Sequence, residues 1–131
     1  MSIRQIKETC LYVTDLDRTA AFYHGQLGLP VISHVEGRHV FFRAGTSVLL
    51  CFIAEKTKED KNLPPHYGSG RLHMAFEVAQ QDYESWKEKV SKAGIPVIHE
   101  EGWKGNLYSF YFHDPDGHVL EIVPEGMWGQ E

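Results

Sequence analysis

The chain has 131 residues, a formal net charge of −5 and 42% hydrophobic residues, which is the composition of a globular protein of single-domain size. Its negative charge argues against nucleic-acid backbones and anionic membranes as partners, because both select basic patches. Charged residues near the start argue against a signal peptide, and no apolar run approaches a membrane span in length. Since only two cysteines occur, we expect no disulfide framework and a cytoplasmic location.

The first half of the chain predicts one strand, one helix and three more strands. Alternating, β-rich residues predict the first strand at residues 8–13. Apolar residues at helical spacing predict a helix from residue 16 to residue 27. Asp15 is a suitable N-cap for this helix, and Gly28 ends it before Pro30. The three further strands are predicted at residues 31–35, 39–43 and 47–53.

A linker is expected at about residues 55–70. It begins with a charge run, residues 55–61, that we expect to be solvated, and it continues with proline and glycine residues typical of loops. The second half then repeats the order of the first. Its predicted elements are a strand at 72–78, a helix at 81–93, and strands at 97–100, 107–113 and 118–123.

Two segments support an internal duplication. Residues 27–32 match residues 93–98, and residues 42–50 resemble residues 112–121, in the same order on both sides of the linker. We therefore predict the α+β fold class, with two βαβββ modules in a single domain. Module one spans about residues 6–54 and module two about residues 71–124.

Aligning the halves makes Glu8 equivalent to His73, and Leu50 equivalent to Glu121. Side chains alternate between the two faces of a strand. In the first strand of the second half, the alternating apolar residues Met74, Phe76 and Val78 suit packing against the helix. This pattern predicts that Glu8, His73 and Glu121 all project from the sheet face that no helix covers.

These three side chains predict a metal site. Two carboxylates and one imidazole suit Mn²⁺, Fe²⁺, Ni²⁺ or Zn²⁺ better than a metal that prefers thiolates. Three protein ligands also leave positions open for water or substrate, as a catalytic site needs. The alternative for each residue is structural: a solvated glutamate at Glu8 or Glu121, or a hydrogen-bonded strand histidine at His73.

Four segments together resemble a known superfamily. They are residues 11–23 (LYVTDLDRTAAFY), 27–29 (LGL), 73–76 (HMAF) and 112–121 (FHDPDGHVLE). The chain resembles, over nearly its whole length, the vicinal oxygen chelate superfamily, which includes glyoxalase I, fosfomycin-resistance enzymes, extradiol dioxygenases and bleomycin-binding proteins. The resemblance implies an open, cup-shaped mixed sheet around one divalent metal ion, with helices on the outer face. It also implies a homodimer, often with each cup built from modules of different chains.

The resemblance places ligands at Glu8, His73, Leu50 and Glu121, and two of these positions depart from the family pattern. The first position usually carries His or Gln, and glyoxalase I has a carboxylate where this chain has Leu50. The missing carboxylate weakens a glyoxalase I interpretation. One histidine with two carboxylates also differs from the two-histidine iron site of extradiol dioxygenases.

Residues 105–112 look like the substrate-binding strand of the fosfomycin-resistance enzymes, and Ser109 and Tyr111 there share one alternation. They are candidates for hydrogen bonding to a substrate, although Glu8 in place of a histidine disfavours a phosphonate dianion. Trp103 is a candidate for stacking on a substrate ring, with core or dimer-interface packing as the alternative. His66 and Tyr67 of the linker are candidates for covering the pocket, with a mobile loop as the alternative.

We therefore expect a metal-dependent enzyme of this superfamily that acts on a small oxygenated metabolite or xenobiotic by lyase, isomerase or transferase chemistry. Candidate groups for proton transfer or nucleophilic attack are Glu8, Tyr111 and Cys10. The alternative for Cys10 is a structural role, because a lone cysteine is more commonly a small buried hydrophobic residue. A Cys10–Cys51 disulfide is not expected, because these side chains should point to opposite faces. The competing hypothesis is a drug-sequestering protein of the bleomycin-resistance type, without catalysis.

Overall fold

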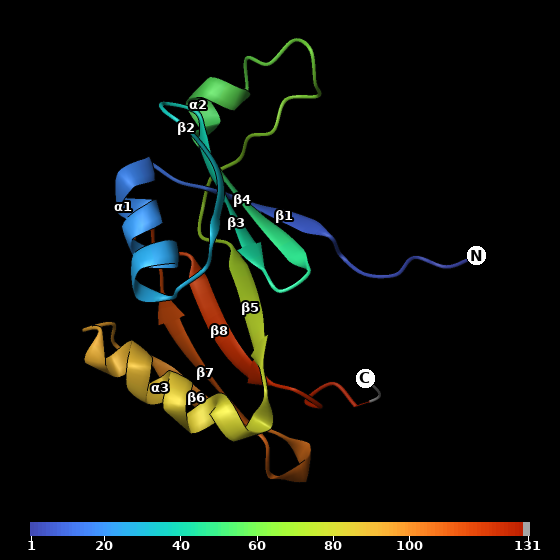
Figure 1. Ribbon diagram of the computed structural model, residues 1–131, viewed down its shortest axis with the longest axis vertical. Helices are drawn as coiled ribbons and strands as arrows, with labels where there is room; N and C mark the ends of the chain where they lie inside the picture. Colours follow the sequence, from blue (N-terminus) through green and yellow to red (C-terminus); the bar gives the residue numbers. More distant parts are fainter. Residues whose placement is uncertain (130–131) are drawn as a thin grey trace. The chain divides into compact units, whose positions relative to one another are not determined.

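The computed structural model describes residues 1–129, and it divides into two compact units, residues 1–70 and residues 71 onward. We call them the N-terminal and the C-terminal unit. Each contains one four-stranded mixed sheet and helices (Figure 1). Among the described residues, none of the helices has the length and apolar character needed to cross a membrane.

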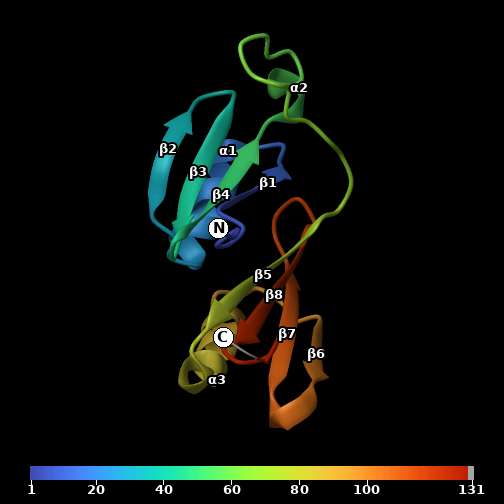
Figure 2. The ribbon, with the colours of Figure 1, turned by 90° about the vertical axis from the view of Figure 1, so that its right-hand side faces the viewer.

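The N-terminal unit contains a sheet in the order β1-β4-β3-β2, with β1 parallel to β4 and the other pairs antiparallel. Figure 2 shows β2, β3 and β4 side by side. The elements of this unit are β1 (Glu8–Tyr12), α1 (Leu16–Ala20), a π-helical segment (Ala21–Gln26), β2 (Val31–Val35), β3 (His39–Ala44), β4 (Ser47–Phe52) and α2 (Ala54–Thr57).

The C-terminal unit repeats this arrangement in the order β5-β8-β7-β6, with β5 parallel to β8. Its elements are β5 (His73–Val78), a 3₁₀ turn (Gln80–Asp82), α3 (Tyr83–Lys92), β6 (His99–Gly102), a second 3₁₀ turn (Lys104–Asn106), β7 (Tyr108–His113) and β8 (Val119–Pro124). The α+β fold class with two βαβββ modules is confirmed by this pair of sheets.

The first helix differs from the prediction in its second half. Asp15 caps α1 as expected, because its side chain accepts a hydrogen bond from the backbone N–H of Arg18 at 3.0 Å. From Ala21 the winding becomes π-helical, and the backbone N–H of Leu27 bonds to the carbonyl of Phe22, five residues earlier, at 3.0 Å. Side-chain periodicity alone does not separate this wider winding from an α-helix.

The charge run that begins the linker was expected to be solvated, and this prediction is wrong in part. Ala54–Thr57 forms the short helix α2, in which Thr57 is fully buried and donates hydrogen bonds to the carbonyls of Ile53 and His66. Asp60 accepts two hydrogen bonds from the Arg38 guanidinium, at 2.8 and 2.9 Å. This bidentate pair ties the linker to the β2–β3 turn, so tertiary contacts order a segment that is locally hydrophilic.

Strand β6 was predicted at residues 97–100 and instead runs from His99 to Gly102. Its position is set by contacts outside the strand. Glu100 accepts hydrogen bonds from the Tyr83 hydroxyl at 2.7 Å and from the Lys87 ammonium at 2.8 Å, both on α3. At the other end, the Trp103 N–H bonds to the Leu107 carbonyl at 2.7 Å and closes the hairpin to β7.

Each sheet buries one face against its own helix. In the N-terminal unit, Tyr23 of the π-helical segment packs on Phe42 with ring centroids 5.4 Å apart, beside buried Leu11 and Leu49. In the C-terminal unit, Tyr83 of α3 packs on Phe110 with centroids 5.6 Å apart. We call the opposite face of each sheet its open face. Strand alternation then places on open faces the predicted site residues that belong to strands, which are Glu8, Cys10, His73, Ser109, Tyr111 and Glu121.

The turn between β7 and β8, Asp114 to His118, holds the start of β5 in place. The Asp114 side chain accepts hydrogen bonds from the backbone N–H groups of Asp116 and His118, both at 2.9 Å. Gly117 has φ of 83°, which glycine adopts without strain. His118 is buried, and its Nδ1 accepts the backbone N–H of Leu72 at 2.9 Å. The turn therefore fixes the backbone directly before His73.

Replacing Asp114 by alanine should destabilise the protein, because two backbone N–H groups of a buried turn lose their charged acceptor. We expect Asp114→Ala to lower the free energy of unfolding by about 2 kcal/mol, measured by urea denaturation. Asp17→Ala is the matched control, since the side chain of Asp17 is 96% exposed. Equal effects of the two substitutions would show that the turn does not depend on the Asp114 acceptor.

Candidate functional site

His73 and Glu121 meet on the open face of the C-terminal unit. The parallel pairing of β5 with β8 sets His73 opposite Val119 and Ala75 opposite Glu121. The His73 Nδ1 lies 2.8 Å from the Val119 carbonyl oxygen. Because a carbonyl only accepts, Nδ1 carries the proton and donates it. The other ring nitrogen, Nε2, lies 3.3 Å from Oε1 of Glu121.

The donor set of this pair fits a metal ion. The Glu121 side chain is only 7% exposed, whereas the His73 side chain is 54% exposed. Within residues 1–129, the Glu121 Oε2 atom is buried without a hydrogen-bond partner. A buried carboxylate oxygen without a partner is costly, and a cation would satisfy it. An imidazole whose far nitrogen donates to a backbone carbonyl is also the usual arrangement of a metal-binding histidine.

Tyr111 lies beside Glu121, because the β7–β8 register pairs these two residues directly. Burial raises the pKa of Tyr111, and a hydrogen bond to the Glu121 carboxylate raises this pKa further, while a hydrogen bond with Ser109 opposes the shift. The Tyr111 ring also lies near two imidazoles, with centroids 6.2 Å from His73 and 5.8 Å from His99.

Ser109 is fully buried and does not present its hydroxyl to solvent. The indole Nε1 of Trp103 donates a hydrogen bond to the Ser109 Oγ at 2.9 Å. Trp103 and Ser109 are therefore joined side chain to side chain across the turn between β6 and β7.

Three further polar residues of this face received no role from the sequence. His99 and Glu101 of β6 form a half-exposed pair, with Nε2 and Oε1 2.9 Å apart. His113 of β7 has an Nδ1 atom that is buried without a hydrogen-bond partner in the described residues. His99, Glu101 and His113 all lie on the same sheet face as Tyr111. The two-residue period of the strands could have placed them there from the sequence.

The N-terminal unit carries the equivalent positions on its own open face. Leu50 pairs with Cys10 and Phe41, just as Glu121 pairs with Ala75 and Tyr111. Glu8, the first residue of β1, is exposed, and Cys10 is half-buried. Both cysteines are free, as expected.

An aromatic cluster occupies the rest of that open face. The His39 ring stacks on Phe41 with centroids 3.9 Å apart, and Phe52 meets both rings edge-on. His66 of the linker packs edge-on against Phe52 at 5.6 Å. Close by in the linker, Gly68 lies against the Tyr12 ring, where an added Cβ would come within 2.9 Å of a ring carbon. The linker thus covers part of the N-terminal open face.

The predicted site residues fall into two groups. The C-terminal unit brings together His73, Glu121, Tyr111, Ser109 and Trp103, while Glu8, Cys10 and His66 belong to the N-terminal unit. Residues 1–129 contain no group of three His, Cys, Asp or Glu side chains placed to hold a metal ion. The third ligand at Glu8 therefore stays a prediction.

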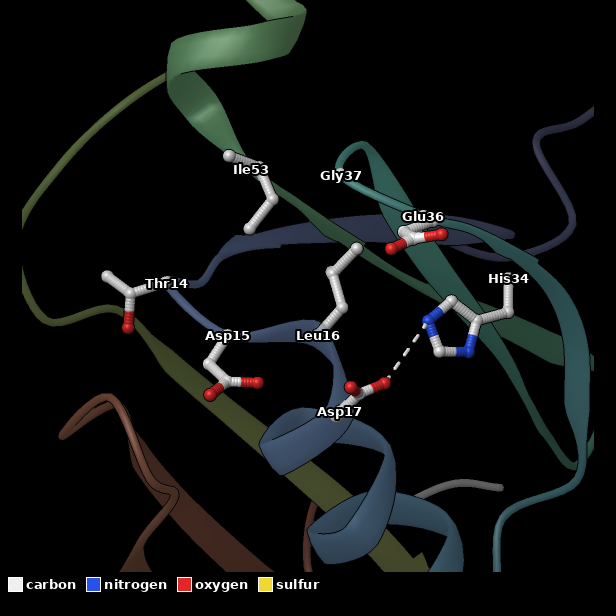
Figure 3. Close-up of a pocket in the computed structure, with 8 residues that line it drawn as sticks. All are labelled: Thr14, Asp15, Leu16, Asp17, His34, Glu36, Gly37 and Ile53. Atoms are coloured by element: carbon white, nitrogen blue, oxygen red, sulfur yellow. Dashed lines mark ion pairs between the residues drawn. The ribbon is translucent and has the colours of Figure 1, made fainter.

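A cavity of about 350 Å³ occurs in the N-terminal unit, and none of the predicted site residues lines it. Figure 3 shows the side chains that surround it, including an Asp17–His34 pair with Oδ1 and Nε2 3.9 Å apart. The lining residues are Thr14, Asp15, Leu16, Asp17, His34, Glu36, Gly37 and Ile53.

Two curated relatives of this chain are transferases by name. It is 31% identical over 126 residues to a glutathione transferase FosA of Serratia marcescens, covering 92% of this chain and 80% of that protein. It is 29% identical over 111 residues to a metallothiol transferase FosB of Bacillus licheniformis, covering 84% of this chain and 68% of that protein.

Solved structures and a family model agree with these relatives. A lactoylglutathione lyase from Agrobacterium tumefaciens superposes with a TM-score of 0.93 and 33% identity, over 99% of this chain and 100% of that one. Residues 5–122 match the model of the Glyoxalase/Bleomycin resistance protein/Dioxygenase superfamily. The chain belongs to this superfamily and is one of its enzymes.

Proposed function

We propose that this enzyme binds one divalent metal ion through His73, Glu121 and Glu8, and that it acts on a small oxygenated metabolite or xenobiotic by transferase or lyase chemistry. The observation that carries the proposal is the His73–Glu121 pair, in which the imidazole Nε2 lies 3.3 Å from Oε1 of a buried carboxylate. Glu8 is proposed as the third ligand because it holds the position in β1 that His73 holds in β5.

The donor atoms define the class of metal. One imidazole nitrogen and carboxylate oxygens suit Mn²⁺, Fe²⁺, Ni²⁺ or Zn²⁺. When bound, such an ion supplies Lewis-acid polarisation of substrate oxygens. The relatives named as a glutathione transferase, a metallothiol transferase and a lactoylglutathione lyase support transfer or lyase chemistry of this kind.

Tyr111 holds a proton next to the proposed metal site. Its raised pKa keeps the phenol protonated at neutral pH, and its hydrogen bond to Glu121 directs the hydroxyl at a proposed ligand. Tyr111 therefore orients Glu121 and can donate a proton, but it is a poor base. Ser109, which shares the alternation of Tyr111 in β7, opposes this rise in the pKa.

Cys10 is a weak candidate for a nucleophile. Burial raises the pKa of its thiol, and the nearby negative charge of Glu8 raises this pKa further. A thiol with a raised pKa is protonated at neutral pH, and the protonated form is a weak nucleophile. Glu8 remains the better candidate for the general base, because it is exposed and carries a carboxylate.

We also propose that the active form is a homodimer in which Glu8 and the His73–Glu121 pair of one site come from different chains. The superfamily resemblance supports this arrangement. It also accounts for a third ligand that lies in a different unit of the chain.

Substitution of the proposed ligands should abolish metal uptake. We expect purified protein to hold about one divalent ion per chain, and His73→Ala and Glu121→Gln to reduce this content at least about tenfold, since each removes a direct ligand. Glu8→Ala should reduce it as well. Metal content is measured by elemental analysis after incubation with Mn²⁺, Fe²⁺, Ni²⁺ or Zn²⁺.

His24→Ala is the matched control for this experiment. The His24 Nδ1 also lies 2.8 Å from a backbone carbonyl, that of Leu29, but within residues 1–129 no carboxylate forms an ion pair with its ring. This variant should keep its metal. A wild-type protein that takes up none of the four ions would contradict the metal proposal.

Mixing two inactive variants tests the dimer. Refolding Glu8→Ala together with His73→Ala should restore metal to roughly a quarter of the sites if each site uses two chains, because only mixed dimers regain one intact site. Each variant refolded alone should stay without metal. Failure to recover any metal in a mixture whose dimers exchange would show that one chain supplies all three ligands.

Removing the charge of Glu8 should activate the Cys10 thiol. A nearby negative charge disfavours the thiolate, so Glu8→Gln should lower the pKa of Cys10 and raise its alkylation rate at pH 8 by about two- to fivefold. The rate is measured with iodoacetamide and mass spectrometry. Buried Cys51 serves as the internal control. An unchanged Cys10 rate would show that Glu8 does not act on this thiol.

A further inference from the structure

His39 is a buried imidazole on the open face of the N-terminal unit. The residue is only 8% exposed, and its ring is stacked on Phe41 with centroids 3.9 Å apart. Its Nε2 lies 3.0 Å from the Ser33 Oγ, a hydroxyl that can donate to this nitrogen or accept from it. The other ring nitrogen, Nδ1, is buried without a hydrogen-bond partner within residues 1–129. One nitrogen of this ring is therefore closed off from both water and partners.

The surroundings of His39 do not accommodate a proton on Nδ1. A protonated imidazole donates from both nitrogens, and among the described residues Nδ1 has no acceptor within hydrogen-bond distance. Burial lowers the pKa of His39, and the charges of Arg38 and His34 lower it further. The charged ring is thus favoured only in a conformation that admits water to Nδ1.

The titratable and charged groups around His39 come from three segments. His34 belongs to β2, and Arg38 directly precedes β3. The linker contributes His66 and Asp60, and both carboxylate oxygens of Asp60 accept hydrogen bonds from Arg38. Arg38 also lowers the pKa of Asp60, so this pair stays ionised in mildly acidic solution. Asp60 therefore pairs with Arg38 and does not neutralise a charged His39.

The linker supplies one ring of the aromatic cluster around His39. Phe52 contacts both the His39 ring, at 6.1 Å, and the His66 ring, at 5.6 Å. Phe41 and Phe52 lie on β3 and β4, which pair with each other along their length. His66 lies in a loop that has no strand or helix between α2 and β5 (Figure 1). Loops open at a lower free energy than paired strands, so the linker is the part of the cluster that can move.

The contacts that hold the loop near His66 are few. The Thr57 hydroxyl donates to the His66 carbonyl, and it also lies 3.4 Å from the Ile53 carbonyl, which can keep this donor when the loop moves. Gly68 lies against the Tyr12 ring. Because Arg38 holds Asp60, residues 61–70 can leave the face while the start of the linker stays attached.

We propose that His39 is an acid-sensitive switch for the linker: when Nδ1 takes up a proton from solvent, the His39–Phe52–His66 packing separates and residues 61–70 move off the N-terminal open face. Release uncovers Tyr12 and the aromatic cluster, so mildly acidic solution widens access to this face. The inference goes beyond the proposed function and does not depend on the metal site.

Papain digestion measures this opening, because a protease cleaves a loop in proportion to its open population when reclosing is fast. Below the ordinary imidazole pKa of about 6.5, the open state binds a proton that the closed state resists. The rate of first cleavage within residues 61–70 should therefore rise about three- to tenfold from pH 7.5 to pH 5.5. Mass spectrometry locates the cut, and a short peptide substrate corrects for the pH dependence of papain itself.

Four variants assign the response to one histidine. His39→Phe keeps a ring on the cluster but cannot take a proton, so its cleavage rate should be the same at both pH values. His39→Gln should behave in the same way, and its amide can keep the hydrogen bond to Ser33. His66→Phe keeps a ring on Phe52 and should retain the acid response. His24→Ala is the matched control, since it removes an exposed histidine of the same unit, and it should also retain the response.

An acid response that persists in His39→Phe and His39→Gln would overturn the proposal, as would its absence from the wild-type protein or its loss in His66→Phe. First cuts within β3 or β4 at pH 5.5 would overturn it too, because the sheet and not the linker would then be the part that opens. Circular dichroism at both pH values shows that each variant is folded. A failure of the metal proposal is seen separately, in the metal content.

Discussion

The parallel pairing of β5 with β8 is the constraint on which the candidate site depends. It sets the His73 ring against the Val119 carbonyl, and this one hydrogen bond decides which imidazole nitrogen faces Glu121. The pairing is held at its start by the Asp114–His118 turn, whose buried histidine accepts the backbone N–H of Leu72. The strand register of the βαβββ module thus orients the His73 ring through the Val119 backbone carbonyl.

The two units of the chain show how one architecture can carry different chemistry. The β1–β4 register repeats that of β5–β8, yet the row Cys10, Leu50 and Phe41 stands where the other unit has Ala75, Glu121 and Tyr111. The N-terminal open face is mostly aromatic, with His39, Phe41 and Phe52 in mutual contact. Burial lowers the pKa of His39, and the charges of Arg38 and His34 lower it further, so this surrounding favours the neutral imidazole.

The sequence predicted the features that depend on local period and on the internal repeat. Alternation in β5 and β8 placed His73 and Glu121 on one face, and the capping of α1 by Asp15 followed from a short polar residue before an apolar helix. Contacts between residues that are distant in the sequence could not be predicted from it. Examples are the Arg38–Asp60 pair that orders the linker, the Trp103–Ser109 hydrogen bond, and the shift of β6 by its contacts with α3. Each of these joins residues whose spacing carries no periodic signal.

Gly68 makes the linker a steric determinant of the N-terminal open face. Because a Cβ at this position would come within 2.9 Å of the Tyr12 ring, a larger residue at position 68 would require the ring or the loop to shift, so the positions of the two are coupled. A change of length or composition in this loop would move Tyr12 and alter the surroundings of Cys10, its neighbour on the same face. Loops diverge faster than the strands they join, so this segment gives the enzyme a route to remodel one wall of its open face without altering any strand.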